Sequence, residues 1–258
     1  MPRGEAGRPI AEWVASLQRP VSWSSAMSEL QSVNRRLANL LTTARLYVHQ
    51  TERGLARLFG RRSPQLITFR TAVEEQVRNS LGHRVMHALR NHLQHSNLPI
   101  HSLTYDSGWK DEKEGRFLVF VTVPKIQVSR LQDDRDLRSI AEELRALGDL
   151  IDVRPLVRQH VQSVMTVHVR VRELVAAEEA NCLSVVEGAL TRGEEAFQGD
   201  AVSLGLVEQD RRGALIQRFE IFREPIERLR YLRRKNPCFA NLPLHYVSGK
   251  ASPGERSG

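Results

Sequence analysis

The sequence is poor in cysteine, with only Cys182 and Cys238 among its 258 residues. Two cysteines provide neither the disulfide framework of a small secreted protein nor the four ligands of a structural zinc site. Long apolar runs are also missing, since none reaches the roughly 20 residues that a membrane-spanning helix requires. The first residues, MPRGEAGRPIAEW, contain no unbroken apolar stretch of the signal-peptide type. We therefore expect a cytoplasmic protein with no membrane segment.

Several catalytic patterns are missing too. The chain has no glycine-rich phosphate loop and no nucleophile elbow, which disfavours a nucleotide-dependent enzyme. Adjacent acids occur, among them the pairs at 142–143 and 178–179, but neighbouring residues on a helix point in different directions. These pairs therefore do not predict a catalytic carboxylate dyad.

What the chain does have is positive charge and enough apolar residues for a core. The formal net charge is +8, the pI is near 10.1, and 41% of the residues are hydrophobic. Basic side chains attract polyanions because each contact with a phosphate releases a bound counterion. On charge alone, RNA, DNA and acidic proteins all remain open as partners.

Apolar residues at spacings of three and four predict two long helices in the first part of the chain. The first covers about 25–59 and the second about 64–96, where Asn97 and Pro99 stop it. Ser63 is placed to cap the second helix. With about 30 residues each, or roughly 45 Å at helical rise, the two helices can pack as a long antiparallel hairpin.

Strand-like and helical patterns alternate in the rest of the chain. The charged turns at 110–115 and 210–213 lie between strand-like segments, so each predicts a β-hairpin. Further helices are expected at about 137–147, from Pro155 to about Leu190, and at 224–236. The predicted fold is therefore mainly α (α+β), a long antiparallel helical hairpin or bundle with one or two small β-hairpins.

Three segments make up the predicted domain organisation. Residues 1–24 are rich in Gly, Pro and Ser and predict a flexible N-terminal arm. Residues 25–236 form one helical domain with a C-terminal α/β extension, and residues 237–258 form a tail.

A polar cluster, LRNHLQHSNLP, occupies the last turn of the second predicted helix. Within it Asn91 and His95 are one turn apart on the same side, and the long side chain of Arg90 can reach round to them. A histidine can take the proton from a ribose 2′-hydroxyl, which then attacks the neighbouring phosphate. Arginine can hold that phosphate, and the asparagine amide can fix the phosphate or orient the histidine ring. This chemistry needs no metal or cofactor and distinguishes RNA from DNA.

His83 and His87 continue this polar row toward the helix start at the same spacing of four. The row lies opposite the apolar stripe, so we expect it to face solvent or a partner. The spacing also suits two metal ligands on one helix face, but a third ligand is missing from the pattern. We therefore predict no metal site. His160 and His168 lie among valines and are predicted to be core-edge histidines with hydrogen-bonded rings.

The segment LRNHLQH resembles the R-N-x-x-x-H signature of the HEPN superfamily, all-helical proteins that include many metal-independent ribonucleases of toxin–antitoxin and phage-defence systems. The wider stretch MHALRNHLQHSNLPIHSL is similar to uncharacterised bacterial proteins with an R-N-x-x-Q-H-x-x-L-P segment. The resemblance covers about residues 26–100, and a β-hairpin follows where the family usually continues in helix.

The resemblance implies an endoribonuclease that leaves 2′,3′-cyclic phosphate ends. Arg90 would bind and stabilise the phosphate, Asn91 would assist, and His95 would be the general base or acid. On the same helix, Arg84, His87 and Gln94 are expected to contact the RNA substrate. The resemblance also implies a homodimer, in which two copies of the motif meet across a symmetry axis, and an antitoxin or defence partner protein.

A different class of function uses the same residues. Arg90 could be a surface arginine paired with a carboxylate such as Glu75, and His95 could simply be favoured by the helix dipole. The chain would then be a non-catalytic helical interaction protein that dimerises, or binds a partner or nucleic acid, through this surface. Near the C-terminus, RYLRRK at 230–235 could grip a phosphate backbone or be an ordinary basic helix end.

Overall fold

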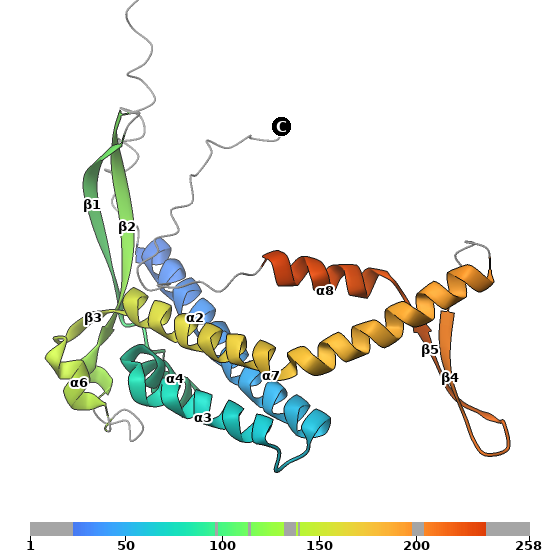
Figure 1. The fold of residues 1–258 in the computed structure, drawn as a ribbon. Helices are drawn as coiled ribbons and strands as arrows, with labels where there is room; N and C mark the ends of the chain where they lie inside the picture. Colours follow the sequence, from blue (N-terminus) through green and yellow to red (C-terminus); the bar gives the residue numbers. More distant parts are fainter. Residues whose placement is uncertain are drawn as a thin grey trace, which may run out of the picture. The chain divides into compact units, whose positions relative to one another are not determined.

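The computed structural model describes residues 23–95, 98–112, 115–131, 138, 140–197 and 204–235. These residues are mainly helical and include two small antiparallel sheets, which confirms the predicted fold class (Figure 1). Within the described ranges, no helix combines the length and apolar character needed to cross a membrane. The predicted arm, apart from its last two residues, and the predicted tail lie outside them.

Packing divides the chain into two units. The first consists of residues 1–50 and 77–161, and the second of residues 51–76 and 162–258. Described elements that lie wholly in the first unit are α4 (Leu81–His95), β1 (Ser102–Glu112), β2 (Gly115–Gln127), the 3-10 helix η1 (Val128–Leu131), α6 (Ala141–Ala146) and β3 (Leu150–Asp152). The helices α2 (Trp23–Phe59), α3 (Pro64–Asn79) and α7 (Val153–Ala196) contribute residues to both units.

The core of the first unit forms where α4 packs among α2, the sheet and the start of α7. α4 alone buries four apolar residues of its inner face, because its apolar residues recur at helical spacing. Its buried partners come from the neighbouring elements, and the core residues include Leu37, Leu41, Val85, Met86, Ala88, Leu89, Ile100, Ile126, Ile140, Leu144, Ile151 and Leu156.

One buried side chain ties the segment before β1 to α2. Asn34 is 1% exposed, and its Oδ1 accepts the backbone N–H of Ile100 at 3.0 Å. Its Nδ2 donates to the Ile100 carbonyl at 3.0 Å and to the Leu30 carbonyl at 3.1 Å. Asn34 therefore satisfies both backbone groups of Ile100, where the chain leaves α4 and begins the hairpin.

The second long predicted helix is wrong as a single element, because the structure interrupts it at Ser80. α3 ends at Asn79 and α4 begins at Leu81. Ser80 acts as an N-cap: its Oγ accepts the backbone N–H of His83 at 3.1 Å. The apolar spacing continues across this point, so the pattern by itself did not reveal the break.

The predicted hairpin around 110–115 is confirmed. β1 and β2 pair antiparallel from Ser102↔Lys125 to Glu112↔Gly115. A third strand, β3, was not predicted; it pairs with the end of β2 through only three residues. β3 leads into α7, whose first turn is capped by Asp152, since Oδ1 of Asp152 accepts the backbone N–H of Arg154 at 2.9 Å.

The second unit contains the remaining predicted elements. Ser63 Oγ accepts the backbone N–H of Leu66 at 3.2 Å, which confirms the predicted cap of α3. The second predicted hairpin is confirmed as β4 (Leu204–Gln209) paired with β5 (Leu215–Ile221), and the last predicted helix as α8 (Glu224–Lys235).

Candidate functional site

α4 carries the predicted motif and crosses the start of α7 at Gly82. The backbone N–H of Gly82 donates to Oε1 of Gln159 at 2.9 Å. A Cβ at position 82 would lie 2.5 Å from the Gln159 Cβ and 2.5 Å from the Leu156 carbonyl oxygen. Only glycine therefore fits at this crossing, which fixes α4 closely against α7 within the first unit.

Two buried histidines meet beside the crossing. The Nδ1 atoms of His83 and His160 are 3.2 Å apart, and the rings stack with centroids 4.9 Å apart. Burial, together with the neighbouring His87, lowers the pKa of His83 to about 4. Burial, together with His83 and His87, likewise lowers the pKa of His160 to about 4. The pair is therefore neutral at neutral pH, so that one ring donates and the other accepts.

The expectation that the whole polar row faces solvent is wrong for His83, which is 8% exposed. The row spirals slowly round the helix, so its first member turns toward α7 while His87, one turn later, is exposed. The prediction that His160 is a core-edge histidine with a hydrogen-bonded ring is confirmed. Among the described residues, no group of three potential ligands is placed to hold a metal ion.

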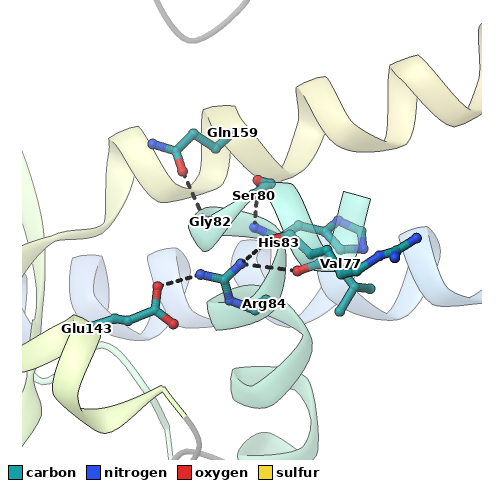
Figure 2. A network of polar contacts seen from close by, with 8 residues as sticks. Val77, Ser80, Gly82, His83, Arg84, Glu143 and Gln159 are labelled. Carbon is teal, nitrogen blue, oxygen red and sulfur yellow. Dashed lines mark hydrogen bonds and ion pairs between the residues drawn. The ribbon is translucent and has the colours of Figure 1, made fainter. Parts of the chain in front are cut away.

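Arg84 holds the break between α3 and α4 together, as Figure 2 shows. Its Nη1 donates to the carbonyl oxygens of Val77 and Arg78, at 3.2 and 2.7 Å, which the end of α3 leaves without helical partners. Its Nη2 forms an ion pair with Glu143 on α6. These contacts give Arg84 a structural role; its predicted contact with RNA stays a prediction.

Arg90 and Asn91 lie together near the end of α4, as the motif predicts. The Arg90 Nη1 donates to Oδ1 of Asn91 at 3.2 Å, and both side chains are half-buried. The Arg90 Nε is buried and, among the described residues, has no hydrogen-bond partner. No described carboxylate, Glu75 included, forms an ion pair with Arg90. Its positive charge is therefore not neutralised within the described part of the chain.

Two residues of the predicted site, Gln94 and His95, are described only as part of the helix backbone. Gln94 and His95 form the last residues of α4, but their side chains lie outside the described part of the molecule. The helical backbone keeps Asn91 and His95 one turn apart, as the prediction requires.

A histidine that the sequence prediction missed lies near the end of α4. The Nδ1 of His101 accepts the backbone N–H of Gln127 at 3.2 Å, so a neutral ring carries its proton on Nε2. Burial lowers the pKa of His101, and the charges of Arg130 and of His92, a buried residue of α4, lower it further. His101 is thus a neutral hydrogen-bond donor, and it is close enough to α4 for the charge of His92 to affect its pKa.

The helical spacing did not point to His101, because it belongs to no spacing pattern with Arg90. His101 comes near α4 because the chain turns back there and enters β1. At this point the backbone N–H of His101 donates to the Lys125 carbonyl at 3.0 Å. A polar residue shortly after a helix-ending proline was the only available cue.

The basic helix end at 230–235 is tied to glutamates in the second unit. Arg230 pairs with Glu187 and Arg233 with Glu179, both on α7. Two of its arginines are therefore used in helix packing, which favours the structural interpretation of this segment over phosphate binding.

A comparison of the chain with protein-family models, with curated proteins and with solved structures finds no match. The residues and their geometry therefore carry the whole functional argument.

Proposed function

We propose that the chain is a HEPN-like, metal-independent endoribonuclease of the toxin or phage-defence type. The observation that carries the proposal is the half-buried guanidinium of Arg90, which has no carboxylate partner in the described part of the chain and is held by Asn91. A half-buried arginine without a carboxylate partner is stabilised by an anion that accepts two of its parallel N–H donors. A phosphodiester has two oxygens in the geometry that this requires.

The proposed reaction uses the groups at the end of α4. His95 takes the proton of a ribose 2′-hydroxyl, whose oxygen attacks the adjacent phosphorus. The bond to the 5′-oxygen breaks, and that oxygen takes a proton from water or from the protonated His95 as it leaves. The products are a 2′,3′-cyclic phosphate and a 5′-hydroxyl. Arg90 stabilises the negative charge on the phosphate oxygens, Asn91 positions the guanidinium, and His87 and Gln94 contact the RNA.

A homodimer belongs to the proposal, because only the R-N-x-x-x-H match at 90–95 lies within one helix. The other match, at 78–83, is interrupted by the helix break at Ser80. In a symmetric pair, two copies of Arg90 and Asn91 would face one cleft and clamp the substrate from both sides. An antitoxin or a defence partner protein would control such an activity.

Cleavage of mixed cellular RNA in the presence of EDTA tests the proposal. We expect cyclic phosphate ends from the unaltered protein, and a loss of roughly 100-fold or more in rate for Arg90→Gln and for His95→Ala, as for other groups that act on the transition state. Arg35→Gln is the matched control, because Arg35 is exposed on α2 and has no partner among the described residues.

Two results would contradict the proposal. One is intact RNA after incubation with the folded protein. The other is cleavage that survives both substitutions. Intact RNA would favour the non-catalytic interaction protein, which uses the same helix to bind a partner. Cleavage that survives both substitutions would show that Arg90 and His95 do not form the active site.

A further inference from the structure

The second unit contains a cleft lined by arginines, at the turn that joins α2 to α3. The cleft has a volume of about 470 Å³. Arg53 and Arg57 lie one turn apart near the end of α2, Arg61 lies in the turn, and Arg70 lies on α3. The sequence prediction did not single out these residues, because they are spread over two helices and meet only when the chain turns at Gly60.

The charge of this cleft is largely uncompensated. Glu52 is the only acidic residue among the described residues of its lining, and it already pairs with Arg70 at 2.7 Å. The side chains of Arg53, Arg57 and Arg61 form no hydrogen bond or ion pair with any described residue. Elsewhere in the same unit, Arg170, Arg223, Arg230 and Arg233 all pair with glutamates. Three guanidiniums without a partner among the described residues therefore lie around one hollow.

The shape and chemistry of the cleft indicate its ligand. Guanidiniums bind phosphate through two parallel N–H donors, and several of them around a groove can follow a chain of phosphates. The apolar part of the lining is Ala56 and Leu66, and Leu66 is fully buried, so the cleft offers no apolar side chain for insertion into a lipid bilayer. A concave site of this kind can enclose a nucleic-acid strand, whereas a flat membrane surface would not enter it.

We propose that the arginine cleft formed by Arg53, Arg57, Arg61 and Arg70 binds the phosphodiester backbone of a nucleic acid. The binding is electrostatic and independent of base sequence, because the described lining offers guanidinium donors and no aromatic side chain for stacking on bases. This site shares no residue with the motif on α4, and its binding does not depend on the proposed cleavage.

The test measures binding of a fluorescein-labelled, single-stranded 2′-O-methyl oligonucleotide by fluorescence anisotropy over a series of KCl concentrations. This probe has no free 2′-hydroxyl, so the proposed nuclease chemistry cannot cleave it, and a failure of cleavage is recorded separately from a failure of binding. We expect Arg57→Gln/Arg61→Gln to weaken binding about tenfold at low salt. We also expect it to reduce the slope of log K against log salt by roughly one to two.

The matched control is Arg211→Gln/Arg212→Gln, which removes the same charge from the exposed turn between β4 and β5. We expect this variant to keep the salt slope of the unaltered protein and to bind within about twofold of it. Equal weakening in both variants would overturn the proposal, because net charge alone would then explain binding. Absence of binding by the unaltered protein would overturn it as well. So would arginine-dependent binding to phosphatidylserine vesicles without binding to the oligonucleotide.

Discussion

At the scale of single residues, Asn34 shows how one polar side chain can determine the path of the backbone. Its amide is matched to the N–H and the C=O of Ile100, which would otherwise be buried without partners. Helical propensity and apolar spacing predict that α2 is a helix. Neither explains why an asparagine lies on its buried face. The contact lies between residues 66 positions apart, so the sequence pattern could not predict it.

Asn34→Leu should lower the free energy of unfolding by about 3 kcal/mol, because both backbone groups of Ile100 lose their partner. Urea unfolding measures the change. Asn39→Leu, an exposed position on the same helix, should change stability by less than about 0.5 kcal/mol. Similar effects at the two positions would contradict the structural role of Asn34.

The pair formed by His83 and His160 predicts a pH-dependent stability. Folding lowers both pKa values from 6.5 to about 4, so between these values the unfolded chain binds more protons than the folded one. The stabilisation is therefore complete above about pH 6.5 and is lost as the pH falls toward 4. At 1.36 kcal/mol per pH unit, the loss amounts to at most roughly 3 kcal/mol per histidine.

Urea unfolding at several pH values in this window tests the prediction. His83→Phe/His160→Phe keeps two stacked rings but removes the titration, so its stability should vary much less between about pH 6.5 and 4. His49→Gln, at an exposed position on α2, should keep the pH dependence of the unaltered protein. A double variant with an unchanged slope would show that other groups cause the pH dependence.

At the scale of elements, the crossing of α4 and α7 depends on the absence of a side chain. Gly82→Ala should lower the free energy of unfolding by about 1–3 kcal/mol, because the new methyl group would overlap Gln159 and the Leu156 carbonyl. Gly54→Ala is the control, because a methyl group at this position of α2 would meet no neighbouring atom within 4 Å. There alanine should stabilise the helix by roughly 0.5–1 kcal/mol. Thermal unfolding measures the change in stability of both variants. A stabilisation by Gly82→Ala as well as by Gly54→Ala would contradict the close approach of α4 to α7.

Element type was largely predictable from the sequence, while element boundaries and partners were not. The apolar spacing predicted α2, α7 and both hairpins, because a helix or strand with one buried face leaves a local pattern. The break at Ser80 was missed because the start of α4 depends on Gln159 and Glu143, which are distant in sequence. β3 was missed because three residues are too few to show a period of two.

The candidate site was predictable to a similar extent. Arg90 and Asn91 are adjacent in sequence, and the structure joins their side chains. His101 and the arginine cleft come from chain segments that meet only after folding, so no spacing rule applies to them.

At the scale of the whole molecule, the proposed homodimer predicts that activity depends on protein concentration. If two copies of the Arg90 site must meet, specific cleavage activity should fall when the protein is diluted below the dissociation constant of the dimer. Light scattering and cleavage rates over the same dilution series provide the measurement. Constant specific activity across a measured change from dimer to monomer would show that one copy suffices.

The arginine cleft also has a consequence for chemical modification. The chain contains 33 arginines and five lysines, and none of the described residues that line the cleft is a lysine. Guanidinium groups stay protonated across the whole physiological pH range, and reagents or enzymes that acylate lysine do not act on them. Acetylation, which switches off many lysine-rich binding surfaces, would therefore leave the charge of this cleft unchanged. Only a competing anion or a modification specific to arginine could reduce its attraction for phosphate.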